Sequence, residues 1–239
     1  MGDRARYPSR HLGAARVGEM VAAKSCEKMG LHVIVLDGIL YALGLTAASG
    51  VVIWLAGPLF AIPLWLLAAF CLYFFRDPDR AVPSGPVAVS PADGKVIEIL
   101  AETPTLNRLT IFLNVFDVHV NRTPIAGKIT DVRYQTGKFL VASKKECSEQ
   151  NEQNIVTIEG EGTRVIFKQI AGLIARRIVF NKKPGDVLET GERIGLMKFG
   201  SRMDVLFGHE WEIVVKPGER VAAGESVIAR RRDSGSHGN

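Results

Sequence analysis

The chain has 239 residues, of which 47% are hydrophobic and 23% are charged, a composition that excludes a disordered polymer. Its 30 basic and 25 acidic residues give a net charge of +5, too mild for a nucleic-acid binder but suited to an anionic membrane face. From this charge we expect no nucleic-acid partner. The three cysteines show no CxxC spacing, so we expect no disulfide framework and no metal centre.

We interpret residues 1–30 as a polar N-terminal extension. One hydrophobic region follows it. From Gly38 to Phe75 the chain contains no Asp, Glu, Lys or Arg, and Gly57-Pro58 divides this stretch in two. Each half is close to the minimum of about 17 residues for a membrane span, so we predict a membrane-associated helical hairpin over residues 31–75, spanning or re-entrant. Basic residues flank only its outer ends, which places both termini on the cytoplasmic face of the cell membrane. Two core helices of a soluble protein are the alternative.

Residues 76–239 form the predicted globular domain, in which short β-branched runs are separated by Gly and Pro. The predicted strands are residues 87–89, 96–100, 109–115, 127–134, 155–159, 163–170 and 212–215. Runs of this length and spacing favour an all-β sandwich or barrel. One helix-like interruption is predicted around residues 170–178.

Two pairs of short motifs recur at the same offset of 33 residues. Lys183-Pro184-Gly185 recurs as Lys216-Pro217-Gly218, and Pro91-Ala92-Asp93-Gly94-Lys95 is echoed by Pro124-Ile125-Ala126-Gly127-Lys128. The KPG-x5-GE pattern resembles the Pro-Gly turn and following strand of lipoyl-type barrel-sandwich hybrids. The predicted fold class is therefore mainly β: a barrel-sandwich-hybrid-like domain with internal pseudo-repeats, preceded by an N-terminal hydrophobic α-helical hairpin.

Four residues are candidates for chemistry. His119 ends a strongly apolar run, a common way to aim a catalytic side chain, although a hydrogen-bonded histidine at a strand end gives the same pattern. Asp93, taken alone, is typical of an Asp-Gly turn. Ser201 follows Gly200 but does not form the G-x-S-x-G elbow of hydrolases. Lys198 stands where a lipoyl-like fold would carry biotin or lipoate.

Five motifs in order resemble the short prokaryotic type of phosphatidylserine decarboxylase. They are Asp77-Pro78, Ser90-Pro91-Ala92-Asp93-Gly94-Lys95-Val96, residues 112–122, residues 169–178 and Phe199-Gly200-Ser201. The resemblance covers about residues 37 to 230, hairpin included, and the five motifs together are far more specific than any one of them.

The resemblance implies a pyruvoyl-dependent enzyme made by self-cleavage between Gly200 and Ser201. The products are a β chain of residues 1–200 and an α chain of residues 201–239. The two chains stay together as a heterodimer, which can form a larger oligomer. Ser201 becomes the pyruvoyl cofactor, which forms a Schiff base with the substrate amine. The implied reaction converts phosphatidylserine, a phospholipid held in the membrane, to phosphatidylethanolamine and carbon dioxide.

The resemblance also implies roles for individual residues. His119 matches a family histidine for cleavage, decarboxylation or both, and Asp93 matches an aspartate that acts with a histidine as the cleavage base. Arg122 stands where longer members carry a second histidine, so a strict Asp-His-Ser triad is in doubt. The arginines expected to contact the substrate phosphate or carboxylate are Arg122, Arg176, Arg177 and Arg202. The rival is a membrane-anchored lipoyl- or biotinyl-type carrier or adaptor, modified at Lys198 and never cut.

Overall fold

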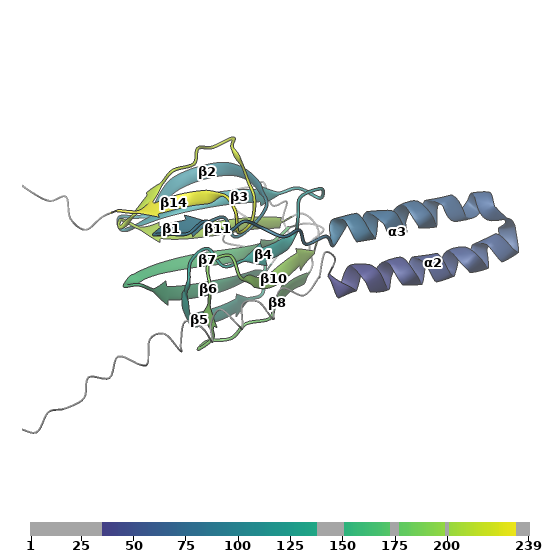
Figure 1. The fold of residues 1–239 in the computed structure, drawn as a ribbon, viewed down its shortest axis with the longest axis horizontal. Coiled ribbons are helices and arrows are strands. Elements are labelled where there is room, and N and C mark those ends of the chain that lie inside the picture. The colour runs from purple at the N-terminus through teal and green to yellow at the C-terminus, as the bar shows by residue number, and fades with distance from the viewer. Residues whose placement is uncertain (1–34, 138–150, 173–176, 199–200, 233–239) are drawn as a thin grey trace, which may run out of the picture. The chain divides into compact units, whose positions relative to one another are not determined.

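The computed structural model describes residues 35–137, 151–172, 177–198 and 201–232 (Figure 1). The polar extension predicted for residues 1–30 lies outside them. The described chain begins with a helical hairpin made of α2 (Leu36–Ala56), the short 3-10 helix η1 (Pro58–Ala61) and α3 (Ile62–Phe74). Gly57 lies between α2 and η1 with a φ of 98°, a backbone conformation that favours glycine, and Pro58 then starts η1. The break predicted at Gly57-Pro58 is confirmed.

The hairpin exposes apolar side chains along its length. Trp54, Leu59 and Phe60 are 83%, 76% and 66% exposed, and the buried residues of α2 are only Gly38, Ala42 and Ser49. Helix α2 is long and apolar enough to cross a membrane, whereas the segment Pro58–Phe74 is shorter. A helix of a soluble core would bury its large apolar side chains, so this exposure favours membrane association.

The rest of the described chain is a β domain, as the sequence predicts. Its strands are β1 (Val87–Val89), β2 (Gly94–Thr103), β3 (Leu106–Leu113), β4 (Val120–Arg122), β5 (Gly127–Gln135), β6 (Gln153–Gly160), β7 (Thr163–Ala171), β8 (Arg177–Phe180), β9 (Val187–Leu188), β10 (Arg193–Lys198), β11 (Ser201–Gly208), β12 (Trp211–Ile213), β13 (Arg220–Val221) and β14 (Val227–Arg231). The predicted mainly β architecture behind a hydrophobic hairpin is confirmed.

These strands form three sheets. The largest has eight strands in the order β13-β2-β3-β11-β7-β6-β5-β9, and two three-stranded sheets have the orders β1-β14-β12 and β4-β10-β8. The main core lies on one face of the large sheet and includes Leu109, Ile111, Phe167, Met203 and Val205. Strand β11 is buried along its whole length and pairs with β3 on one side and β7 on the other. The segment after Ser201 is therefore a central part of the fold.

The internal repeat is visible in the backbone. Gly185 and Gly218 both have a φ of 99°, so the two KPG turns share one conformation. Each turn docks on the strand that begins with the earlier motif: the Gly185 amide donates to Ile129 of β5, and the Gly218 amide donates to Val96 of β2, both at 2.8 Å. The sequence offset of 33 residues thus marks two related β units.

The helix-like interruption predicted around residues 170–178 is wrong where the structure describes it. Residues 170 and 171 end β7, and residues 177 and 178 begin β8. Strand β8 pairs with β10, so tertiary pairing decides the conformation there rather than local preference. Residues 173–176 lie outside the described chain.

The hairpin meets the β domain through a second apolar cluster. Phe74 and Phe75, at the end of α3, are buried with Val118, Val120 and Leu196. The Val35 amide also donates to the Phe75 carbonyl oxygen at 2.8 Å, which ties the start of α2 to the end of α3. The two ends of the hairpin are thus joined at the β domain.

Candidate active site

Ser201 opens the central strand β11. It lies opposite Leu113 of β3 and Ala171 of β7, and it is fully buried. Its Oγ atom has no hydrogen-bond partner among the residues that the structure describes. A buried hydroxyl without a partner is rare and costs folding free energy, which makes Ser201 a candidate for chemistry. Gly200, the residue before the predicted cut, lies outside the described residues.

His119 lies just before β4 and is also fully buried. Its Nδ1 atom is 2.9 Å from the carbonyl oxygen of Asp117. Because a carbonyl oxygen only accepts, Nδ1 carries the proton, and in the neutral ring Nε2 is the unprotonated nitrogen. Nε2 accepts no hydrogen bond from any described residue. Burial lowers the pKa of His119 to about 4, so the ring is neutral near pH 7 and Nε2 is available as a base.

The topology brings His119 and Ser201 to the same region. Strand β3 pairs with β11 at Leu113 and Ser201, and β4 pairs with β10 at Val120 and Leu196. The Met197 amide also donates to the His119 carbonyl oxygen at 3.1 Å. The connection from β3 to β4 and the connection from β10 to β11 therefore join the same two sheets. His119 is the last residue of the first connection, and Ser201 directly follows the second. No hydrogen bond joins their side chains.

A chain of buried amides supports this region, and the sequence analysis missed it. Asn154 Nδ2 donates to Gln169 Oε1 at 3.0 Å, and Gln169 Nε2 donates to Asn121 Oδ1 at 2.9 Å. Gln169 lies opposite Met203, which makes it a diagonal neighbour of Ser201 on the same face of the sheet. Asn121 Nδ2 ends this row of amides as a buried donor without a partner in the described part of the protein. Asn121 follows His119 by two residues. This proximity is the one sequence signal that could have indicated Asn121.

Replacing Gln169 with leucine should destabilise the uncut precursor measurably. The substitution leaves Asn121 Oδ1 and Asn154 Nδ2 without their partners, and each buried unpaired group costs about 1–3 kcal/mol. Urea unfolding of the detergent-solubilised precursor measures the loss. The double variant Asn121→Leu/Gln169→Leu is the control, because it should lose less than the sum of the two single variants. Additive losses would show that the two amides do not act as one chain.

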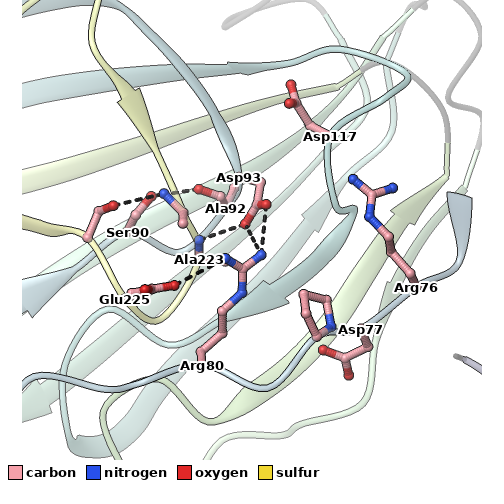
Figure 2. Close-up of polar contacts among 12 residues, drawn as sticks. Arg76, Asp77, Arg80, Ser90, Ala92, Asp93, Asp117, Ala223 and Glu225 are labelled. Carbon is pink, nitrogen blue, oxygen red and sulfur yellow. Dashed lines mark hydrogen bonds and ion pairs between the residues drawn. The ribbon is translucent and has the colours of Figure 1, made fainter. Parts of the chain in front are cut away.

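Asp93 occupies the turn before β2, as its Asp-Gly pair predicts, and its carboxylate is engaged on two sides (Figure 2). Arg80 contacts both carboxylate oxygens, at 2.8 and 3.0 Å, and the Ala223 amide donates to Oδ1 at 2.7 Å. Arg80 also pairs with Glu225 at 3.3 Å. The structure does not join Asp93 to His119 or Ser201 by a hydrogen bond. Its observed contacts instead fix the turn against the segment around residue 223.

Two of the four arginines expected at the substrate are buried in ion pairs. Arg122 Nη2 lies 2.8 Å from Asp77 Oδ1, and the same guanidinium donates to the Gly191 carbonyl oxygen at 3.2 Å. Arg202 Nε lies 2.7 Å from Asp204. Burial lowers the pKa of Arg122, partly offset by Asp77. Arg176 and the side chain of Arg177 lie outside the described residues, so their predicted contacts stay predictions.

Lys198, the modification site of the carrier alternative, is buried at the hairpin junction. Its Nζ atom lies 3.0 Å from Asp37 Oδ2, near the start of α2, and 5.6 Å from the centre of the Tyr41 ring. A carrier lysine must reach partner enzymes, whereas this one is a buried residue of β10 whose ammonium group pairs with Asp37 of the hairpin. The structure therefore does not favour the carrier reading.

Known proteins resemble this chain over most of its length. A family model described as phosphatidylserine decarboxylase matches residues 67–229. A protein of Solibacter usitatus named phosphatidylserine decarboxylase proenzyme is 72% identical over 200 residues, covering 84% of this chain and 98% of that relative. Proteins with the same name from Erythrobacter litoralis and Magnetococcus marinus are 45% and 43% identical and cover 81% and 79% of this chain, with 86% and 89% of their own lengths. The chain therefore belongs to the phosphatidylserine decarboxylase family.

Proposed function

We propose that this protein is a self-processing, pyruvoyl-dependent decarboxylase that converts phosphatidylserine to phosphatidylethanolamine and carbon dioxide. The observation that carries the proposal is a pair of buried atoms, Ser201 Oγ and His119 Nε2, to which no described residue hydrogen-bonds and which lie at the ends of two connections that join the same sheets. Family membership supplies the substrate, since the relatives are named phosphatidylserine decarboxylase proenzymes.

Self-cleavage begins at the Ser201 hydroxyl. In the proposal, Ser201 Oγ gives its proton to a base and adds to the carbonyl carbon of Gly200, and transfer of the acyl group from nitrogen to oxygen leaves an ester. Loss of the Ser201 α-proton then expels the Gly200 carboxylate, which ends the β chain. Water hydrolyses the remaining unsaturated amine, releasing ammonia and leaving a carbonyl at position 201 on the α chain.

His119 is the base that the structure offers for the first proton transfer. Its Nε2 atom is unprotonated near neutral pH because burial lowers the pKa of the ring to about 4. The hydrogen bond to Asp117 fixes the tautomer, and the Phe74 ring, with its centroid 4.3 Å from that of the imidazole, limits ring rotation. A base held neutral and oriented in this way costs no reorganisation when Ser201 reacts.

The residues around position 201 fit a small covalent carbonyl group. Leu113 and Ala171 flank the position through the backbone ladder, and both are fully buried. The pyruvoyl group supplies an electron sink for the pair of electrons left when carbon dioxide departs. The chain's own residues hold that position, and His119 Nε2 can take up the proton that the substrate amine loses and return it to the substrate carbon.

The hairpin is proposed to hold the domain on the cytoplasmic face of the membrane. Its exposed apolar residues support membrane contact, and the basic residues at its outer ends support the orientation. A substrate with two acyl chains lies in the same bilayer, so attachment confines the enzyme and its substrate to one surface.

Intact mass of the purified protein under denaturing conditions tests the proposal. We expect two polypeptides, with the smaller beginning at residue 201, blocked to Edman sequencing and lighter than a serine-terminated peptide by one ammonia. Membranes carrying the protein should release labelled carbon dioxide from carboxyl-labelled phosphatidylserine. A single chain with an adduct on Lys198 would instead establish the carrier, and a single unmodified chain would exclude both functions.

Asp93→Asn and Arg80→Gln should slow self-cleavage to a similar extent. Each variant breaks the same ion pair, and the Asp93 carboxylate contacts Arg80 and the Ala223 amide rather than His119 or Ser201. The rate at which the small chain appears after synthesis measures the effect. If Asp93 acts as the cleavage base, as the resemblance implies, only Asp93→Asn will be strongly impaired, and that outcome would contradict a positioning role.

A further inference from the structure

Arg76 directly follows the hairpin and is held in a fixed orientation. Its Nη1 donates to the Tyr73 carbonyl oxygen at 2.8 Å, and its Nη2 donates to the Phe116 carbonyl oxygen at 2.7 Å. The guanidinium carbon lies 3.9 Å from the centre of the Tyr73 ring. Two carbonyl oxygens and an aromatic face therefore set its position before any ligand arrives.

The charge of Arg76 is not neutralised by the part of the chain that the structure describes. No described Asp or Glu pairs with it, and Figure 2 draws no contact from Arg76 to Asp77 or Asp117. Those carboxylates are engaged elsewhere, Asp77 by Arg122 and Arg193, and Asp117 by Arg220. The arginine is only partly buried and keeps N–H donors beyond the two that the carbonyl oxygens use. A fixed, accessible and unpaired guanidinium matches a planar or tetrahedral oxyanion.

Arg76 lies close to the proposed base. Phe116, which accepts its hydrogen bond, belongs to the same connection as His119, and Phe74, two residues before Arg76, packs on the His119 ring. The positive charge of Arg76 is also one of the causes that lower the pKa of His119. An anion bound at Arg76 would therefore sit beside the reacting region.

The place of Arg76 in the chain indicates which anion it meets. It is the first charged residue after the apolar stretch that ends at Phe75, so it stands where the hairpin leaves the apolar phase. The phosphate groups of a bilayer lie at that boundary. The seryl carboxylate is a poorer ligand, because a paired cation would stabilise the charge that decarboxylation must release.

We propose that Arg76 binds the phosphodiester of the phospholipid substrate and so positions the seryl headgroup next to His119. This inference rests on the proposed function and adds a substrate contact that the sequence analysis did not identify. It also gives the anion-binding role to an arginine that no described carboxylate pairs with, in place of the buried Arg122 and Arg202.

Arg76→Gln tests the proposal in mature enzyme solubilised in neutral detergent micelles. We expect the KM for phosphatidylserine to rise about 10- to 100-fold, as for loss of charge-assisted hydrogen bonds, with kcat within about twofold and the cleaved fraction unchanged. Arg76→Lys keeps the charge without the fork of donors and should give an intermediate KM. Arg133→Gln, at an exposed arginine of β5 paired with Asp131, is the matched control and should leave KM unchanged.

Glycerophosphoethanolamine identifies the group that is bound, because it carries the phosphodiester but no carboxylate and no acyl chains. Its inhibition constant should rise in Arg76→Gln by the same factor as KM. An unchanged inhibition constant with a raised KM would mean that Arg76 binds the carboxylate, and an unchanged KM would mean that it binds neither. A defect seen on phosphatidylglycerol-containing vesicles but absent in neutral micelles would mean general attraction to an anionic surface. Each of these three results overturns the proposal.

A direct binding measurement separates this inference from the proposed function. Glycerophosphoethanolamine is titrated into the uncut Ser201→Ala precursor, with and without Arg76→Gln, and followed by phosphorus NMR. Weaker binding in the double variant supports the inference whether or not turnover occurs, and equal binding overturns it. Absence of cleavage in the wild-type chain would instead overturn the proposed function.

Discussion

Ser201→Ala should leave a single uncut chain of residues 1–239 with no decarboxylase activity. Without the hydroxyl, no group at position 201 can attack the preceding carbonyl, so neither the new chain end nor the covalent carbonyl forms. The loss is expected to be complete, because the same atom is needed for maturation and for the cofactor. Denaturing gels show the chain pattern, and release of labelled carbon dioxide shows the activity.

Folding must be checked separately, since alanine removes a buried unpartnered polar atom and should preserve the strand. Cooperative unfolding at or above the wild-type urea midpoint would show that the uncut chain is native. Ser84→Ala, at an exposed serine before β1, is the matched control and should be cut and active. Appearance of the small chain in Ser201→Ala would show that the cut lies elsewhere.

His119→Ala should slow self-cleavage by about 10²- to 10⁴-fold, the range typical for loss of a general base. Pulse-labelled protein resolves this rate as the conversion of one band into two. Turnover is then expressed per chain that carries the covalent carbonyl, so that a role in decarboxylation is measured apart from the role in maturation. Normal cleavage and normal turnover together would exclude His119 from the site.

The pH dependence of cleavage adds a signature that a purely structural role would lack. His119 has a folded-state pKa of about 4, below its ordinary value of 6.5, so the base stays unprotonated until the pH falls toward 4. The rate of cleavage should therefore not fall through protonation of His119 between about pH 7 and pH 5, and it should fall as the pH approaches 4.

The same pKa shift lowers the free energy of unfolding in acid. The unfolded chain binds the proton below about pH 6.5, so the stabilising contribution of the neutral ring is lost between pH 6.5 and pH 4. His209→Ala, at an exposed histidine, is the control.

The hairpin and the repeat could be predicted from the sequence because each depends on a local pattern. A charge-free run broken at Gly57-Pro58 is sufficient for two apolar helices, and the recurring KPG motifs mark equivalent turns. Strand β11 was missed because Arg202 and Asp204 interrupt its apolar pattern. In the folded chain these two charged side chains form an ion pair inside the protein. The alternation of apolar and polar residues cannot predict such a pair.

The site was only partly predictable for the same reason. Ser201 and His119 became candidates from motif order, and the structure adds that each is buried with a side-chain atom to which no described residue hydrogen-bonds. The contacts of Asp93 with Arg80 and Ala223 join segments that only the fold brings together. Arg76 gave no signal of its own, because an arginine after an apolar helix is common and only its carbonyl partners and the engaged carboxylates around it make it unusual.

The central position of β11 has a consequence for the fate of the cut protein. The strand keeps its backbone bonds to β3 and β7 on both edges, and β13 and β14 of the same fragment pair with β2 and β1. Cleavage before Ser201, as proposed, would therefore create a new chain terminus without releasing a fragment, because strands of the two pieces pair with each other and separating them would require unfolding the whole domain. The two chains of such an enzyme should stay associated at any dilution. Mixing the two chains after they have been made separately should restore no activity unless they are refolded together.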